Sequence, residues 1–151
     1  MRGAHMANRN KAKGTRFETL ATRALRAFGL RAIKPRQEGR RDVADVHVSP
    51  FVLQLKDWTS WQDAIREGLD GAEVQVKNAG EQYGVAIVKR ARRKVGEAYA
   101  VTTLATFARV VRRMLRAEAL LAEIHPEAYR VHAAETAAEL AEPFPSGNER
   151  D

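Results

Sequence analysis

Apolar residues near the start of the chain repeat with the spacing of an α-helix. They form one stripe at about 3.6 residues per turn: Phe17, Leu20, Ala21, Ala24, Leu25 and Phe28. Thr15 can cap the start of this helix, and Gly29 suits the left-handed position that follows its last turn. The pattern therefore predicts a helix over residues 16–28, and we expect the polar, basic residues 7–14 to form a disordered arm before it.

Two later segments alternate between apolar and polar residues, which is typical of strands. In residues 43–48 the last two valines face one way and Asp45 faces the other. In residues 51–56 the large apolar residues face one way, and Gln54 and Lys56 face the other. A Ser-Pro pair between the segments predicts a tight turn, so we expect a hairpin that brings these three polar side chains to one end of a sheet.

A second helix is expected directly after the hairpin. Ser60 can cap its start and Gly80 can end it, with Gly68 and Gly71 as weak points inside. The side of this helix that we expect to be buried carries Trp61, Ile65, Ala72, Val76 and Ala79. The continuous apolar run over residues 83–88 then predicts a strand that is covered on both faces.

The second half of the chain adds further elements. Residues 30–33 and 99–102 are candidates for short strands, and a third helix is expected from Thr103. Its expected core stripe is Leu104, Phe107, Ala108, Val111, Met114 and Leu115. Beyond Ile124 the chain is rich in Ala and Glu, which predicts a helix over residues 127–141 and a disordered end.

The order of these elements indicates an α/β fold. A helix is followed by three strands, a helix and a strand (α-β-β-β-α-β), and a central mixed β-sheet flanked by helices is the natural packing for that order. The first six residues read as an expression-vector scar, which with the basic arm makes up residues 1–14. We assign residues 15–123 to one domain and residues 124–151 to an acidic helix and tail.

The charge of the chain is uneven. The net charge is +7; residues 124–151 hold six acids and two bases, which leaves +11 on residues 1–123. A body this basic attracts a polyanion by releasing its counterions, so we expect a nucleic acid partner. Cysteine is absent, which excludes disulfides, cysteine-ligated zinc and cysteine nucleophiles and suits a cytoplasmic protein. No apolar run reaches the roughly 18 residues of a membrane span, so we expect no membrane partner.

Four residues form a candidate hydrolytic site. Asp45, Gln54 and Lys56 converge on the hairpin, and Glu18 lies at the edge of the first helix's apolar stripe, from which it can reach the sheet. Oxygen donors of this kind hold Mg²⁺, the metal offsets charge on a phosphate, and a lysine orients or activates the attacking water. The set therefore predicts phosphodiester hydrolysis with Mg²⁺, for which Mn²⁺ can substitute.

Glu18, followed by the segment from Asp45 to Lys56, resembles the PD-(D/E)XK nuclease superfamily. Within it, the chain is most similar to Holliday-junction resolvases of archaeal and phage type. The early Lys13-Gly14-x-x-Phe17-Glu18 is similar to a helix motif of that group, and residues 84–93 and 99–107 resemble its phage and actinobacterial members. The likeness covers residues 11–116.

This resemblance implies a restriction-endonuclease-like core and a homodimer that cleaves branched DNA in recombination, in a phage-infected or bacterial cytoplasm. It also implies that Glu18, Asp45, Gln54 and Lys56 are catalytic and that the first three hold the metal. One position departs from the family pattern, because Gln54 stands where the family has an acid. Three interpretations stay open: Gln54 is still a ligand, a carboxylate on the second helix (Glu73 or Asp70) replaces it, or the site is degraded and the protein only binds DNA.

Lysines and arginines close in sequence to the candidate site residues, and those in the basic run after the 83–88 strand, are candidates for phosphate contacts. They are Lys13, Arg36, Arg40, Arg41, Lys89, Arg90, Arg92, Arg93 and Lys94. Trp58 and Trp61 can stack on bases, but we expect them in the core or in a dimer interface. The sequence thus predicts a structure-selective, Mg²⁺-dependent DNA endonuclease, with a catalytically silent DNA-binding protein and a basic structural or assembly protein as alternatives.

Overall fold

The structure, a computed structural model, describes residues 2–35 and 44–148. The chain divides into two compact units. The first contains the chain up to Thr102 together with the segment from Phe144 onward, and the second is Thr103–Pro143. All the strands of the described residues lie in the first unit, and it also holds the candidate site.

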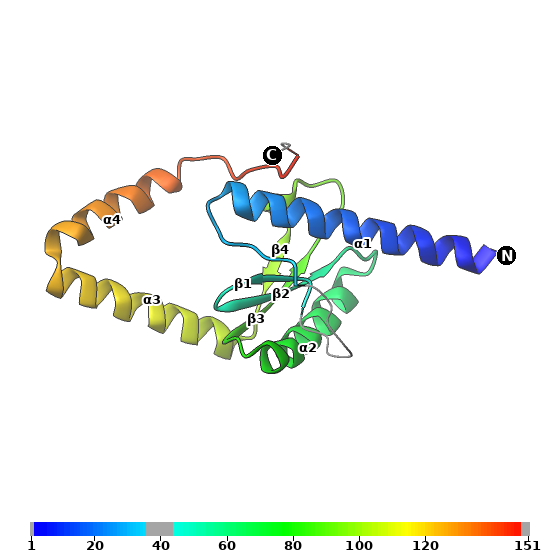
Figure 1. Cartoon of the computed structure of the whole chain (residues 1–151), viewed down its shortest axis with the longest axis horizontal. Helices are drawn as coiled ribbons and strands as arrows, with labels where there is room; N and C mark the ends of the chain where they lie inside the picture. The colour runs from blue at the N-terminus through cyan, green and yellow to red at the C-terminus, as the bar shows by residue number, and fades with distance from the viewer. Residues whose placement is uncertain (1, 36–43, 149–151) are drawn as a thin grey trace. The chain divides into compact units, whose positions relative to one another are not determined.

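A four-stranded mixed sheet forms the centre of the first unit (Figure 1). Its strands, in spatial order, are β1 (Val46–Val48), β2 (Phe51–Lys56), β3 (Tyr83–Val88) and β4 (Tyr99–Val101). β1 and β4 are antiparallel to their neighbours, and the central pair, β2 and β3, is parallel. The expected hairpin is confirmed, and so is the α/β class with a mixed sheet.

One expected strand does not form. Residues 30–33 make only an isolated bridge, in which Ile33 and His47 exchange two backbone hydrogen bonds of 2.8 Å. Ala32 is buried beside this bridge whereas Ile33 is exposed, so the segment packs on the hairpin through one small side chain. The strand order is therefore two strands, a helix and two strands, rather than three strands before the helix.

The first helix, α1 (Arg2–Ala27), packs through the predicted apolar stripe. Phe17, Ala21 and Ala24 are buried, while Phe28 lies beyond the helix. The helix ends as expected at Gly29, whose φ of 87° lets the chain reverse while the Leu30 amide bonds back to the last turn.

The start of α1 differs from the prediction. Helical backbone runs from Arg2, so residues 7–14 are part of the helix and Thr15 is an interior residue rather than a cap. The Thr15 carbonyl accepts a hydrogen bond from the Thr19 hydroxyl one turn later. The residues before Gly14 are mostly Ala, Asn, Lys and Arg, and a single glycine opposes helix by only about 1 kcal/mol, so it does not end the element.

The second helix, α2 (Trp61–Ala79), begins and ends where expected. The Ser60 hydroxyl accepts a hydrogen bond from the Asp63 amide, and Gly80 ends the helix in the left-handed conformation. Its buried side was predicted only in part. Ala72 is buried as predicted, and Ile65, Val76 and Ala79 are half-buried, whereas Trp61 is exposed. The buried residues that the prediction lacked are Ala64, Gly68 and Gln75.

The glycines of α2 explain this difference. Gly68 is so close to β3 that an added Cβ would lie 2.9 Å from the Ala86 Cβ, and Gly71 faces the Gln54 side chain of β2. Small residues here allow the helix to approach the sheet closely, and a hydrophobicity pattern does not score glycine as a buried residue. The fully buried face of α2 therefore consists of small residues and Gln75, and the larger apolar side chains of the helix are half-buried or exposed.

The two helices cover opposite faces of the sheet. Phe17 and Ala21 of α1 share a core with Leu53, Leu55 and Val85, which point to one face. The alternate residues of β2 and β3 point to α2, and a Cβ on Gly84 would touch the Ala72 backbone. Figure 1 shows the sheet between these helices. Gln54 and Lys56 consequently point to the α2 side, as the alternation predicts.

Two short segments complete the first unit. A 3₁₀ turn, η1 (Val95–Glu97), lies between β3 and β4. The segment 144–148, expected to be disordered, returns to α1, where the Phe144 and Phe28 rings lie 5.1 Å apart. Gly147 is buried there, and a Cβ on it would collide with the Leu20 carbonyl. This segment is part of the first unit's packing.

The second unit consists of α3 (Leu104–Ile124) and α4 (Pro126–Glu139). Both helices lie close to their predicted positions, and the Thr103 hydroxyl caps α3. The predicted core stripe of α3 is wrong, because none of its described residues is buried. Leu104, Phe107, Met114 and Leu115 are exposed: a pair of helices offers too little surface to cover an apolar stripe on all sides.

Candidate nucleic-acid cleft

An open cleft of about 880 Å³ lies where β2 and β3 end. Residues 54–59 form its floor, the turn after β3 forms one wall, and the middle of α1 contributes Lys13, Gly14 and Glu18. Parallel neighbouring strands end at the same edge of a sheet, so the residues after β2 and after β3 meet here. The topology of the sheet therefore sets the position of the cleft.

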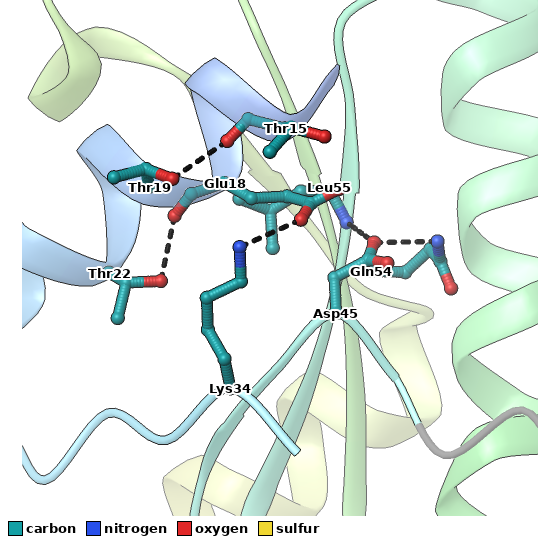
Figure 2. Close-up of polar contacts among 8 residues, drawn as sticks. All are labelled: Thr15, Glu18, Thr19, Thr22, Lys34, Asp45, Gln54 and Leu55. Carbon is teal, nitrogen blue, oxygen red and sulfur yellow. Dashed lines mark hydrogen bonds and ion pairs between the residues drawn. The ribbon is translucent and has the colours of Figure 1, made fainter. Parts of the chain in front are cut away.

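Asp45 and Gln54 are joined by a hydrogen bond in the cleft (Figure 2). The Asp45 Oδ2 atom accepts a hydrogen bond of 2.7 Å from Gln54 Nε2 and another of 2.7 Å from the Leu55 backbone amide. Gln54 is buried and Asp45 is half-buried. The sequence predicts that Gln54 points at the Asp45 carboxylate, and this contact confirms it.

The local backbone aims Asp45 at the floor of the cleft. Asp45 lies just before β1, and in the hairpin Val46 pairs with Leu53, so the residue before Val46 lies beside Gln54. The preceding residue, Ala44, has a φ of 102°, which non-glycine residues rarely adopt. The chain thus bends sharply just before the carboxylate. Strained backbone of this kind is often found at functional sites.

The second carboxylate, Glu18, comes from α1. Its Oε2 atom lies 3.0 Å from the Lys34 ammonium, an ion pair that Figure 2 also shows. Glu18 directly follows Phe17, whose ring is buried in the core. The packing of that ring fixes this turn of α1 and so holds the Glu18 carboxylate at the edge of the cleft. The expectation that Glu18 reaches the sheet edge is confirmed.

Lys56 and Lys89 bring ammonium groups into the same cleft. The Lys56 Nζ atom lies 5.1 Å from the centre of the Trp58 ring, within cation–π range. Lys89 pairs with Asp57 at 2.8 Å, and it lies 5.9 Å from the Phe17 ring on the core side. These contacts fix two cations next to the Asp45–Gln54 pair.

The basic turn after β3 forms the outer wall. Arg90, Arg92 and Arg93 all line the cleft. The Arg90 guanidinium lies 4.9 Å from the Tyr99 ring centre, and Arg93 pairs with Glu97 at 3.3 Å. Arg92 is exposed and has a φ of 59°. Among the described residues, six cations and three carboxylates line the cleft, so its field attracts anions.

Most of the predicted site residues meet in this cleft. The structure brings together Lys13, Glu18, Asp45, Gln54, Lys56, Lys89, Arg90, Arg92 and Arg93. Lys94 follows the wall but does not line the cleft. Arg36, Arg40 and Arg41 lie outside the described residues.

The substitute acids on α2 do not reach the cleft. Glu73 and Asp70 are exposed and lie on the side of α2 opposite the buried Ala72 and Gln75. A substitute acid on this helix was one of the three interpretations that the sequence left open, and the structure does not favour it, since neither side chain lines the cleft. The 100° turn per residue carries both side chains away from the sheet.

Four cleft residues were missed as site residues by sequence reasoning. Asp57 directly follows β2, and Trp58, Trp61 and Tyr99 lie around it. The two tryptophans were expected in the core or in a dimer interface; the structure exposes both of them and places them on the lining of the cleft, so they are not in the core. The available signal for Asp57 and Trp58 was their position directly after β2, since residues just beyond the end of a strand belong to the sheet edge.

The donor set allows only a lightly held cation. Among residues 2–35 and 44–148, no group of three or more His, Asp or Glu side chains is arranged to hold a metal. The cleft does offer hard oxygen donors: the carboxylates of Glu18 and Asp45 and the amide oxygen of Gln54. Such donors suit Mg²⁺, which keeps several waters and needs few protein ligands. The residues therefore fit one hydrated dication.

Comparisons of the chain with protein-family models, with curated proteins and with solved structures gave no match. No helix among the described residues combines the length and apolar character that crossing a membrane requires. The cleft is thus interpreted from its own residues.

Proposed function

We propose that this protein is a Mg²⁺-dependent endonuclease that acts on DNA, with branched DNA as its preferred substrate. One observation supports the proposal above all others. An acid that lies just before one strand of a hairpin, and an amide and a lysine on the other strand, meet in a cleft whose wall is formed by arginines. A nuclease needs both parts: oxygen donors for a cation, and cations for the phosphates on either side.

Each residue of the cleft has a distinct role in this proposal. Asp45 and Glu18 hold the cation, and Gln54 completes its ligand set. The bound dication would offset the charge of the phosphodiester and lower the pKa of a water molecule. Lys56 orients the attacking water or stabilises the charge that develops on the phosphate. The surrounding arginines hold the DNA backbone, and they carry no sequence information.

The amide of Gln54 is compatible with this role. Its nitrogen now donates to Asp45. An amide carries a donor nitrogen and an acceptor oxygen on one rotatable group, so the same side chain offers Asp45 a hydrogen bond or offers a cation its oxygen. A neutral ligand binds Mg²⁺ less strongly than a carboxylate, so we expect cleavage to require millimolar rather than micromolar metal.

The preference for branched DNA and the expected homodimer depend on the resemblance to junction resolvases. The basic cleft supports DNA binding but does not select one DNA form, because phosphate contacts are common to all of them.

A cleavage panel tests the proposal. End-labelled four-way junction, flap and blunt duplex are incubated with the protein in Mg²⁺, in Mn²⁺ and in EDTA. We expect cleavage with either metal, fastest on a branched form. Asp45→Asn should lower the rate at least about a hundredfold, because a bound metal contributes several kcal/mol to such a transition state. Asp70→Asn, an exposed acid outside the cleft, is the control and should keep the wild-type rate.

The alternative function is a catalytically silent DNA-binding protein of the same fold. It is favoured by Gln54, which puts a neutral amide in the cleft at the position where the resembled family has an acid. In that case wild type and Asp45→Asn bind all the DNA forms, and neither cleaves any of them in Mg²⁺ or Mn²⁺. Failure of both binding and cleavage would leave the structural or assembly role.

A further inference from the structure

Three aromatic side chains form an exposed wall in the cleft. Trp58, Trp61 and Tyr99 all line it, and their side chains are 41%, 50% and 41% exposed. The Trp61 and Tyr99 ring centres lie 6.1 Å apart, with the planes tilted by 50°. We call these three residues the aromatic wall. Rings of this size are normally buried, so their gathering in a basic cleft needs a reason.

Cations lie beside the rings. The Lys56 ammonium is over Trp58, and the Arg90 guanidinium is over Tyr99. Two of the three rings, Trp58 and Tyr99, therefore have a positive group beside them, and all three line the cleft. The arrangement alternates flat apolar surfaces with cations, and it matches a ligand that alternates flat apolar groups with phosphates.

We propose that the aromatic wall stacks the unpaired bases of single-stranded DNA, so that the cleft holds a single-stranded segment rather than an intact duplex. In a duplex the base faces are covered by their neighbours, and only base edges are accessible in the grooves. A ring in the cleft gains nothing from such DNA. Unpaired bases expose both faces, and stacking one on an aromatic side chain contributes substantially to affinity whatever the base.

This inference rests on the proposed binding of DNA in the cleft, and it names the part of a branched substrate that enters. Branch points and flaps provide unpaired nucleotides next to duplex. The arginine wall would then hold phosphates while the rings hold the bases of the same strand. Cleavage would take place beside the unpaired nucleotides.

The chain itself carries a probe for the test. Its only two tryptophans are Trp58 and Trp61, so fluorescence excited selectively in tryptophan reports on the aromatic wall. The experiment titrates the full chain, in EDTA, with a thymidine octamer and with an abasic octamer that has the same phosphates and no bases. We expect the thymidine octamer to quench the fluorescence and to bind about tenfold more tightly than the abasic one.

Variants assign the effect to the rings. Trp61→Ala should weaken binding of the thymidine octamer about tenfold and leave binding of the abasic octamer within about twofold, and Trp61→Phe should recover most of the loss. Phe107→Ala is the control, because Phe107 is an equally exposed aromatic residue in the second unit. It should bind both octamers as wild type does.

The outcomes separate the two proposals. If both octamers bind equally and the fluorescence is unchanged, the aromatic wall does not stack bases, although DNA binding in the cleft stands. If a blunt duplex binds more tightly than the thymidine octamer and Trp61→Ala changes neither, the inference is likewise overturned. If neither octamer nor duplex binds, both the inference and the proposed function fail.

Discussion

The Gln54 side chain is buried and donates a hydrogen bond to the Asp45 carboxylate. Its amide neutralises part of the field of Asp45 through a 2.7 Å contact. A hydrogen bond to a charged acceptor is among the stronger ones in proteins. The amide therefore stabilises this arrangement of Asp45 by itself, whereas a carboxylate at this position would need a cation between the two acids.

Gln54→Glu tests this balance. The change places two carboxylates within hydrogen-bonding distance in a buried setting, and we expect it to lower the free energy of unfolding in EDTA by on the order of 1–3 kcal/mol. Added Mg²⁺ should restore that loss and should support cleavage at a lower concentration than in wild type. Thermal unfolding with and without Mg²⁺ measures the first effect, and a metal titration of cleavage measures the second.

Gln62→Glu is the matched control, because Gln62 is exposed on the first turn of α2 and the charge change is the same. It should not become dependent on Mg²⁺ for its stability. Equal behaviour of the two variants would remove position 54 from the metal site.

At the scale of elements, the close approach of α2 to the sheet sets the floor of the cleft. Gly68 has no room for a side chain, because an added Cβ lies 2.9 Å from the Ala86 Cβ, and an alanine cannot move aside. At Gly71 an added Cβ meets the Gln54 oxygen at 3.5 Å, which is an ordinary contact. The two glycines of one helix therefore have different reasons to be small.

Gly68→Ala should destabilise the protein by on the order of 1 kcal/mol, because the overpacking outweighs the gain in helix propensity. Gly71→Ala should be neutral or stabilise by up to about 1 kcal/mol through that same propensity. Urea unfolding of the two variants provides the comparison. A loss of stability in Gly71→Ala equal to that in Gly68→Ala would contradict the packing described for α2.

The elements themselves were largely predictable, because β2, β3 and the caps of α2 follow from alternation, an apolar run and Ser60 with Gly80. The buried face of α2 was not, since it depends on Gly68 against Ala86, a contact between segments far apart in the sequence. The convergence of Asp45 and Gln54 was predictable because a hairpin fixes its own register.

The aromatic wall was not predictable in the same way. Tyr99 lies far along the chain from Trp58 and Trp61, and only the alignment of β4 with β3 brings them together. The exposed stripe of α3 was misread for a related reason: periodicity identifies an apolar face, but it does not say whether another element covers it.

At the scale of the whole molecule, the proposed binding of DNA depends on charge. The cations of the cleft belong to the first unit, and Arg92 and Arg93 stand on its outer wall. Each phosphate contact releases condensed counterions, so affinity depends steeply on salt.

Replacing Arg92 and Arg93 together with Ala should weaken binding to duplex and branched DNA alike and flatten the slope of log affinity against log salt by up to about two units. A matched control replaces Arg23 and Arg66, which are exposed outside the cleft and remove the same charge. Binding curves at several salt concentrations provide the slopes. Equal slopes for the two double variants would show that net charge, and not the cleft wall, sets the affinity.

The return of segment 144–148 to α1 makes Thr103–Pro143 an insertion in the first unit rather than an appendage at its end. Chain on both sides of the insertion is held by the same unit, through Phe144 against Phe28 and through the burial of Gly147. The entropy of closing such an insertion grows only slowly with its length, so these helices can be lengthened or shortened with little effect on the stability of the first unit. A protease that cleaves between α3 and α4 should leave two fragments that stay associated, because the C-terminal fragment still packs on the first unit through Phe144 and Gly147.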